Sequence, residues 1–199
     1  MNPFRNSILI LAAGKQERWN PGTVLPKAKQ LLKVGGETLL ERMARQFHDP
    51  IVFTNHPDIQ EHFKRCYEPR DSLTTVSTLH STKAHWREWT TILLGDVMYS
   101  RLQVKRLARQ KEKVMFYGDE AEIYCLKFHE DVRKVMAKAI RDLTNHVQWE
   151  EKYGKLWNLY RILIGVDYRE HRIGSNFTWV GDCRDFDTRE EYLNFVNKN

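Results

Sequence analysis

Cysteine is scarce in this 199-residue sequence, and long apolar runs are missing. The three cysteines, Cys66, Cys125 and Cys183, are an odd number at wide spacing, and no CxxC pair occurs. They predict neither a disulfide framework nor a zinc site, so we expect reduced thiols in a cytoplasmic protein. No stretch approaches the roughly 18 consecutive apolar residues of a membrane-spanning helix, and we expect no membrane partner.

Two common phosphate-binding patterns are absent as well. The sequence contains no GxGxxG and no GxxxxGK[ST], which excludes the usual dinucleotide fingerprint and the P-loop. Its 32 Lys and Arg residues exceed its 26 Asp and Glu residues, but the basic residues are scattered among the acids. This distribution argues against a nucleic-acid partner and suits a small polyanionic ligand.

Apolar runs alternate with helical patterns along the first half of the chain. This is the βαβ rhythm of a parallel sheet covered by helices on both faces. The predicted strands are 7–13, 50–55, 74–78 and 90–96, and the predicted helices include 37–47 and 58–67. We therefore predict one α/β domain over residues 1–199, with a mostly parallel central sheet flanked by helices.

The second half predicts antiparallel strands followed by helices. Two apolar runs flank a turn at Gly118–Asp119, and an amphipathic helix follows them. The predicted elements are strands 113–117 and 121–129, a helix over 130–143, a helical segment over 149–163, a strand over 176–181 and a closing helix over 189–196.

Two strand ends are candidates for a ligand site. Ligands of open α/β sheets bind at the carboxyl ends of the strands, which places the turn at Gly14 and the pair Gly95–Asp96 on one rim. Four basic residues follow Gly14 closely in the sequence: Lys15, Arg18, Lys27 and Lys29. Asp96 has two interpretations, a cap for the next helix or a ligand for a hard divalent cation.

A second group of acids lies near the C-terminus. The segment DCRDFDTREEY contains Asp182, Asp185 and Asp187 directly before a predicted helix. Either Asp187 or Thr188 could cap this helix, with a glutamate at the third helical position completing a capping box.

Four segments together resemble the nucleotidyltransferases of the glycosyltransferase-A-like fold. That family includes sugar-phosphate nucleotidyltransferases, cytidylyltransferases for small phosphorylated alcohols and the molybdenum-cofactor guanylyltransferase. The segments occur in the family's order and cover almost the whole chain: LAAGKQER (11–18), KQLLKVGGETLLER (29–42), LLGDV (93–97) and DFDTREEY (185–192).

The resemblance implies a role for each matching residue. A strand end and turn would contact the nucleotide: Leu11, Ala12, Ala13 and Gly14. Arg18 would bind the β- and γ-phosphates, and Lys29 would stabilise charge on the α-phosphate. Asp96 would be the principal Mg²⁺ ligand, and Asp187 the second.

The sequence departs from the family's pattern in two places. Gln16 stands where the family often has a second glycine in its signature loop, which affects how closely the loop can wrap a triphosphate. In PKAKQLL, either Lys27 or Lys29 could be the functional lysine.

The implied reaction needs no protein nucleophile. The phosphate of a small acceptor, a sugar phosphate or a phospho-alcohol such as phosphocholine, attacks the α-phosphorus of a nucleoside triphosphate, and pyrophosphate leaves. Two alternatives stay open: a glycosyltransferase of the same fold, for which the letters DFD at 185–187 match a DxD metal motif, and a nucleotide-binding module without catalysis.

One aromatic helix face also has more than one interpretation. Tyr153, Trp157 and Tyr160 share a face at helical spacing. This face could belong to the core, form a homodimer contact, or be a wall for the acceptor, where aromatic rings could bind a quaternary ammonium.

We predict that Lys29, and not Lys27, acts on the phosphates, because Lys29 stands directly before Gln30-Leu31-Leu32, whose apolar pair would anchor it. Lys29→Ala should then lower kcat and kcat/KM together, whereas Lys27→Ala should at most raise KM for the triphosphate. Steady-state kinetics of both variants tests this. A large loss of kcat in Lys27→Ala alone would reverse the assignment.

Overall fold

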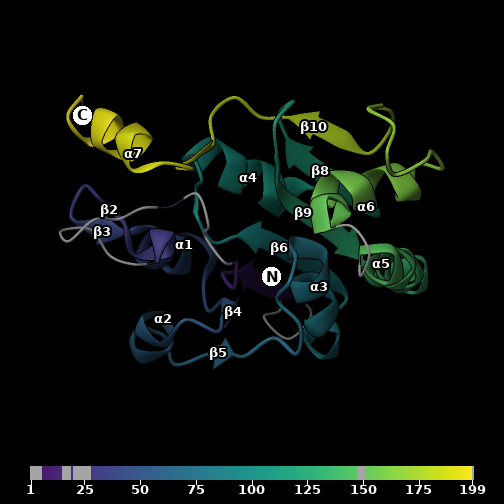
Figure 1. Ribbon diagram of the computed structural model, residues 1–199, viewed down its shortest axis with the longest axis horizontal. Helices are drawn as coiled ribbons and strands as arrows, with labels where there is room; N and C mark the ends of the chain where they lie inside the picture. Colours follow the sequence, from purple (N-terminus) through teal and green to yellow (C-terminus); the bar gives the residue numbers. More distant parts are fainter. Residues whose placement is uncertain (1–5, 15–18, 20–27, 148–150, 199) are drawn as a thin grey trace.

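A seven-stranded sheet lies between two layers of helices in the computed structural model (Figure 1). The structure describes residues 6–14, 19, 28–147 and 151–198. The strand order is β10-β8-β9-β6-β1-β4-β5. Four of the six neighbouring pairs are parallel, and β9 runs antiparallel to β6 and β8. The predicted α/β fold with a mostly parallel central sheet is therefore confirmed.

The strands of this sheet are short, as is usual for α/β proteins. The main sheet contains β1 (Asn6–Leu11), β4 (Ile51–Phe53), β5 (Cys66–Tyr67), β6 (Trp89–Leu94), β8 (Val114–Gly118), β9 (Ile123–His129) and β10 (Phe177–Trp179). Two small antiparallel pairs join β2 (Lys33–Val34) to β3 (Glu37–Thr38) and β7 (Val97–Met98) to β11 (Arg184–Asp185).

The helices follow the strands in sequence. The α-helices are α1 (Leu39–Phe47), α2 (Pro57–His62), α3 (Thr75–Ser81), α4 (Arg101–Arg109), α5 (Arg133–Val147), α6 (Leu156–Leu163) and α7 (Arg189–Val196). Short 3₁₀ helices are η2 (Lys29–Leu31), η3 (Lys83–His85), η4 (Glu130–Val132) and η5 (Glu151–Tyr153). In the part of the chain that is described, no helix has both the length and the apolar character needed to span a membrane.

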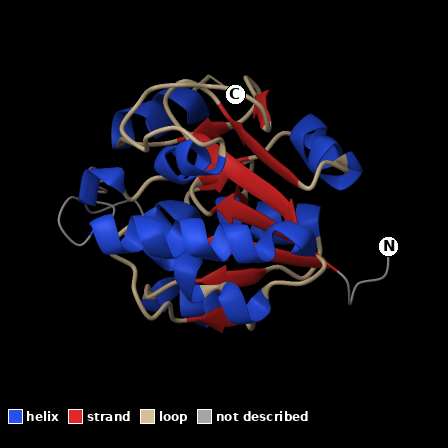
Figure 2. Ribbon diagram, turned by 90° about the vertical axis from the view of Figure 1, so that its right-hand side faces the viewer, coloured by secondary structure: helices blue, strands red, loops and turns tan. Residues whose placement is uncertain are grey.

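Strand β1 shows how the two layers form. Successive side chains of a strand point to opposite faces of the sheet. Leu9 and Leu11 pack with α3, α5 and α6, whereas Ile10 and Ala12 pack with α1, α2 and α4. Helix α5 runs across the front of the molecule in Figure 2. Because both faces are covered, the strand is apolar from Ile8 onward, as its sequence indicates.

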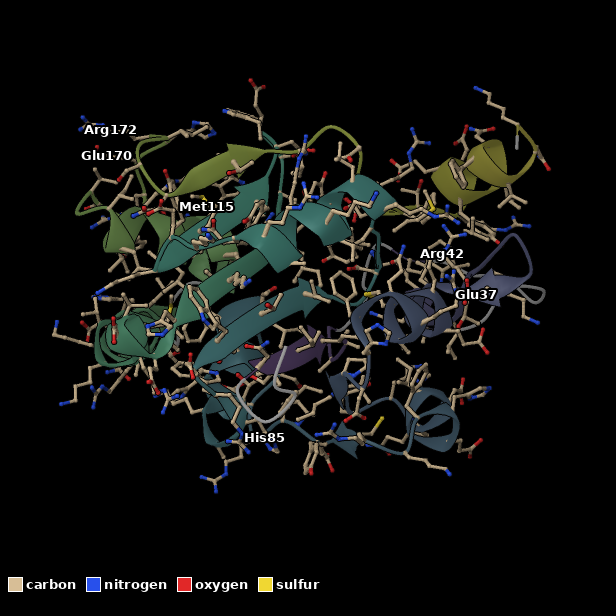
Figure 3. All side chains as sticks on the ribbon, turned by 180° about the vertical axis from the view of Figure 1, so that it is seen from behind. Glu37, Arg42, His85, Met115, Glu170 and Arg172 are labelled. Atoms are coloured by element: carbon tan, nitrogen blue, oxygen red, sulfur yellow. The ribbon has the colours of Figure 1, made fainter. Side chains whose placement is uncertain are left out.

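The short hairpin β2–β3 depends on two glycines. Gly35 and Gly36 have φ values of +64° and +85°, which residues with a side chain rarely adopt. Helix α1 follows directly, capped by Thr38, whose side chain accepts a hydrogen bond from the Glu41 amide at 3.1 Å. Glu37 of the hairpin lies beside Arg42 of α1 (Figure 3), with 3.8 Å between charged atoms. The hairpin and α1 therefore form one unit.

The strand predicted at 74–78 is wrong. Threonine and valine favour strands, but Thr74 accepts a hydrogen bond from the Ser77 amide at 3.1 Å and caps helix α3. Val76 is fully buried between α3 and the sheet. The local cap and this burial together outweigh β-propensity.

Two predicted helices are shorter than expected. The helix predicted over 58–67 ends at His62, and Cys66–Tyr67 instead form the edge strand β5. Within the segment predicted as helical over 149–163, α6 begins only at Leu156, because Gly154 separates it from the 3₁₀ helix η5. Trp149 lies outside the described residues.

Candidate functional site

Gly95 brings two neighbouring strand ends close together. Its amide donates to the Leu11 carbonyl at 2.9 Å, and a Cβ atom at this position would meet Leu11 O and the Ala12 side chain at 3.0 Å. A larger residue would push β1 and β6 apart. Asp96 therefore lies on the same rim as Gly14, as predicted from the strand order.

Lys29 is the centre of the acidic cluster on this rim. Its Nζ atom lies 3.0 Å from Asp96 Oδ2 and 3.5 Å from Asp187 Oδ1, and its side chain is only 8% exposed. Burial alone would lower the pKa of Lys29, but the nearby carboxylates outweigh it and raise that pKa above its ordinary value. The ammonium is thus held in its charged form between two carboxylates.

The backbone of Lys29 is anchored in the core on both sides. Ala28 and Leu32 are fully buried, and the Leu32 amide donates to the Lys29 carbonyl at 3.0 Å. The anchoring expected from the apolar residues after Lys29 is therefore confirmed. Lys27 and Arg18, the other two basic residues predicted for this site, lie outside the described residues, as does Gln16.

Neither Asp96 nor Asp187 caps a helix. Helix α4 is capped by Ser100, and helix α7 by Thr188, whose hydroxyl accepts from the Glu191 amide at 3.2 Å. The capping interpretation of the two aspartates is thus wrong, and both carboxylates face Lys29 instead.

Asp185 is a third carboxylate of this cluster. Strand β11 pairs Asp185 with Val97, next to Asp96. Phe186 is fully buried beneath α7, so the two flanking aspartates face the opposite way, into the cavity. Burial raises the pKa of Asp185 first, and the charges of Asp96 and Asp187 raise it further. The metal-ligand prediction omitted Asp185, although the DFD pattern contained the signal.

A first cavity of about 410 Å³ opens above these residues. Its lining includes Leu11, Ala13 and Gly14 from the predicted nucleotide-binding turn, together with Lys29 and Asp96. Among the described residues, no atom lies within 4 Å of a Cβ position built on Gly14, so none of them hinders the approach of a ligand to this backbone.

Ala12 lies at the predicted strand end with its side chain in the core. Its side chain is 1% exposed and packs in the core beneath the other face of the sheet. Its carbonyl accepts a hydrogen bond from the Thr54 hydroxyl at 3.0 Å. Ala12 thus shapes the strand end and does not line the cavity.

Hydroxyl side chains form one wall of the first cavity. They come from the segment before α3 and from its first turns: Ser72, Thr74, Thr75 and Thr78. None of these four residues was predicted for the site, and three of them, Thr74, Thr75 and Thr78, lie where a strand was expected. The threonine cap that begins α3 was the available signal.

A second cavity, of about 990 Å³, adjoins the first. Four side chains line both cavities: Glu122, Lys155, Asp185 and Asp187. Strand β9, the β11 segment and helix α7 supply most of the remaining lining, including Tyr124, Arg184, Glu191, Asn194 and Lys198. The two cavities therefore adjoin at a polar junction formed by these four residues.

Glu122 is a partly buried carboxyl group at the junction, with 25% of its side chain exposed. Desolvation by burial raises its pKa to about 7, with Asp96 and Asp185 adding to the effect and Lys155 opposing it. The Lys155 Nζ atom lies 3.9 Å from Glu122 Oε2. Neither residue was predicted from the sequence.

The carboxylates of the first cavity fit a hard divalent cation whose coordination is completed by oxygen atoms of a bound substrate and of water. Among the described residues lining the first cavity, four carboxyl groups face two lysines. No three His, Cys, Asp or Glu side chains in that part of the chain stand close enough to hold a metal ion by themselves. Mg²⁺ is commonly held by one or two carboxylates together with substrate phosphates and water, which matches two aspartates beside an open cavity.

The aromatic face of α6 belongs to the core. Trp157 and Tyr160 are 4% and 0% exposed, and they pack against Phe116 and Phe177. The core interpretation is confirmed for these two residues, so neither can form an acceptor wall or a dimer contact. A homodimer stays a prediction.

Comparisons with known proteins agree with this geometry. The family described as "MobA-like NTP transferase domain" matches residues 8–155, so Asp185 and Asp187 lie beyond the match. No curated protein matches the chain in sequence.

Several solved structures share the fold. The CTP:phosphocholine cytidylyltransferase of Streptococcus pneumoniae is 13% identical with a TM-score of 0.63, covering 98% of this chain and 99% of that one. The inositol-1-phosphate CTP transferase of T. maritima is 10% identical with a TM-score of 0.61, covering 94% and 91%. The 4-diphosphocytidyl-2C-methyl-D-erythritol synthase of Anaerococcus prevotii is 13% identical with a TM-score of 0.60, covering 97% and 96%.

The partly buried Glu122 carboxyl predicts a pH-dependent contribution to stability. Its native pKa of about 7 lies above its ordinary value of 4.5, so the proton stabilises the fold below about pH 4.5 and this is lost as the pH rises through 7. The free energy of unfolding of Glu122→Gln, minus that of the wild type, should rise by at most about 3 kcal/mol between pH 4.5 and 8. Urea unfolding across this range measures it, with the exposed neighbour Glu120→Gln as control; parallel curves for wild type and Glu122→Gln would contradict the prediction.

Proposed function

Because this chain belongs to the family of MobA-like NTP transferase domains, we propose that it transfers a nucleoside monophosphate from a nucleoside triphosphate to a small phosphorylated acceptor. As a member of that family, the protein is a nucleotidyltransferase that uses a nucleoside triphosphate. The observation that carries the finer proposal is Lys29, held between Asp96 and Asp187 where two cavities meet at the rim of the sheet.

In this proposal the triphosphate occupies the first cavity, with its phosphates over the open backbone at Gly14. Lys29 lies at the cavity floor, where its ammonium can neutralise charge that develops on the α-phosphoryl group. Since Lys29 is buried and anchored, its position costs little reorganisation during the reaction.

The acceptor then occupies the second cavity. An oxygen of its phosphate forms a bond to the α-phosphorus, the bond from that phosphorus to the bridging oxygen breaks, and pyrophosphate leaves. The chain's contribution is to align two anions and to offset their charge, and no protein nucleophile takes part.

Asp96 and Asp187 are the residues we propose for holding Mg²⁺, with Asp185 adding negative charge beside them. When bound, the ion would offset charge on the phosphates and orient them. The ion would also compete with Lys29 for both carboxylates, which would let the ammonium turn toward the triphosphate.

Two observations support the proposed acceptor class. Structural neighbours named for phosphocholine and inositol 1-phosphate act on small phosphorylated alcohols. A cavity of about 990 Å³ lined by charged groups of both signs suits such a molecule. A sugar phosphate and a phospho-alcohol such as phosphocholine both remain within the proposal.

The letters DFD also left a glycosyltransferase open, and Asp185 and Asp187 both line the cavity as a DxD pair would, but membership of the NTP transferase family favours nucleotidyl transfer. Release of pyrophosphate separates the two, since a glycosyltransferase using a nucleotide-sugar produces none. A nucleotide-binding module without catalysis would bind a triphosphate but would not release pyrophosphate.

We expect one of the four ribonucleoside triphosphates, with Mg²⁺, to raise the melting temperature and to support pyrophosphate release with a phosphorylated acceptor. At about 100 times its Kd, a ligand adds roughly 2.7 kcal/mol of stability.

Asp96→Asn should keep the fold and lose about a hundredfold or more in turnover. Wild-type turnover in this variant across a Mg²⁺ titration would contradict the Asp96 assignment, and the exposed Asp142→Asn serves as control.

Asp187→Asn tests the second proposed ligand. Thr188 caps α7, so the melting temperature should change little, while more Mg²⁺ should be needed for half-maximal activity. Unaltered Mg²⁺ dependence would show that Asp187 only pairs with Lys29.

A further inference from the structure

The junction between the two cavities contains an ammonium group with a second possible position. Among the described residues, two lysines line the first cavity, and Lys29 is shared between two carboxylates. Lys155 lines both cavities, its side chain is 55% exposed, and its Nζ atom lies 3.9 Å from Glu122. At this distance the pair is close but not tightly hydrogen-bonded.

We propose that Lys155 binds the phosphate group of the acceptor at the junction of the two cavities, and that Glu122 holds the Lys155 ammonium there before the acceptor binds. This inference rests on the proposed function, which requires an acceptor phosphate beside the α-phosphorus. Lys155 is a positioning residue in this account, since it aligns the attacking phosphate.

The backbone of Lys155 is fixed although its side chain is exposed. The Val76 amide donates to the Gly154 carbonyl at 3.0 Å, and a Cβ atom on Gly154 would lie 2.2 Å from Thr74. The segment before Lys155 is thus pressed against the start of α3, and α6 begins directly after it. A long flexible stem on a rigid base can move its charge between nearby partners.

Glu122 is held by the turn between β8 and β9. Its amide donates to Asp119 Oδ1 at 2.9 Å, and its carbonyl accepts from the Asp119 amide at 2.9 Å. A Cβ atom on Gly118 would lie 2.3 Å from the Glu122 carbonyl oxygen, so the turn requires glycine there. The backbone from which the carboxyl group extends is consequently fixed, and burial disfavours the charged form of that group.

Charge explains why such a lysine is needed. An acceptor phosphate at the junction would meet three carboxyl groups, Glu122, Asp185 and Asp187, all of which line both cavities. Their repulsion must be offset by a cation at the junction. Three described basic residues line the second cavity, Lys155, Arg184 and Lys198, and of these only Lys155 also lines the first. Lys155 meets this need by leaving Glu122, a carboxyl group whose raised pKa makes it a weak partner.

The test measures binding of inorganic phosphate by calorimetry, using protein saturated with the nucleoside triphosphate that stabilises it. Lys155→Ala should weaken phosphate binding about tenfold or more, as expected for loss of a charge-assisted hydrogen bond. Glu122→Gln should tighten it, because the variant keeps the shape but removes the competing charge. Lys138→Ala, an exposed lysine paired with Asp142 on α5, should leave it unchanged.

With a turnover substrate, Lys155→Ala should raise KM for the acceptor and leave KM for the triphosphate within about twofold. Unchanged phosphate binding in Lys155→Ala, or no measurable binding in the wild type, would overturn the proposal. An equal rise in both KM values would do the same, by assigning Lys155 to the triphosphate.

The experiments distinguish a failure of the proposed role of Lys155 from a failure of the proposed function on which that role rests. Pyrophosphate release with unchanged phosphate binding in Lys155→Ala overturns the role of Lys155 and leaves the function standing. If no triphosphate stabilises the protein, the proposed function fails, and the phosphate titration is carried out on nucleotide-free protein. If Lys155→Ala weakens phosphate binding tenfold in nucleotide-free protein, Lys155 is supported as a phosphate-binding residue. If phosphate binding is unchanged, this role is overturned as well.

Discussion

The ion cluster at Lys29 is the interaction on which the site depends. A buried ammonium without partners would be expensive, and so would carboxylates at the same place without a cation. Lys29 lies 3.0 Å from Asp96 and 3.5 Å from Asp187, so each charge makes the other tolerable. Three separate parts of the chain are thereby joined: the η2 segment, the end of β6 and the segment before α7. The fold creates this cluster by holding two strand ends together at Gly95.

Much of the fold could be predicted because local and tertiary preferences agree. The closing helix Arg189–Val196 matches its prediction, since Thr188 and Glu191 form a capping box visible in the sequence. The β8–β9 hairpin was likewise visible from its turn. The strand prediction for 74–78 was wrong because the residues favour strands, whereas the cap at Thr74 and the burial of Val76 stabilise a helix. A prediction was reliable where the local preference of the residues agreed with their capping and tertiary burial, and not merely where one signal was strong.

The site was predictable in part for a similar reason. Lys29, Asp96 and Asp187 belong to sequence motifs, and the structure brings all three together. Glu122 and Lys155 belong to no such motif, and they meet only because the start of β9 lies near the start of α6. Residues that depend on tertiary packing alone, without a local pattern, leave no trace in a single sequence.

The separation of 158 residues between Lys29 and Asp187 has a consequence for how the protein is made. The strands β1, β4 and β6 come from the first half of the chain and can pair while a ribosome is still adding the second half. Asp187 is synthesised long after them, so a nascent chain can contain most of the sheet and still lack one side of the charge cluster. The same holds for a chain cut by a protease just before β11, which would keep much of its core and lose this carboxylate. Completion of the site therefore requires that synthesis has passed Asp187 and that the chain is uncut between Lys29 and this residue.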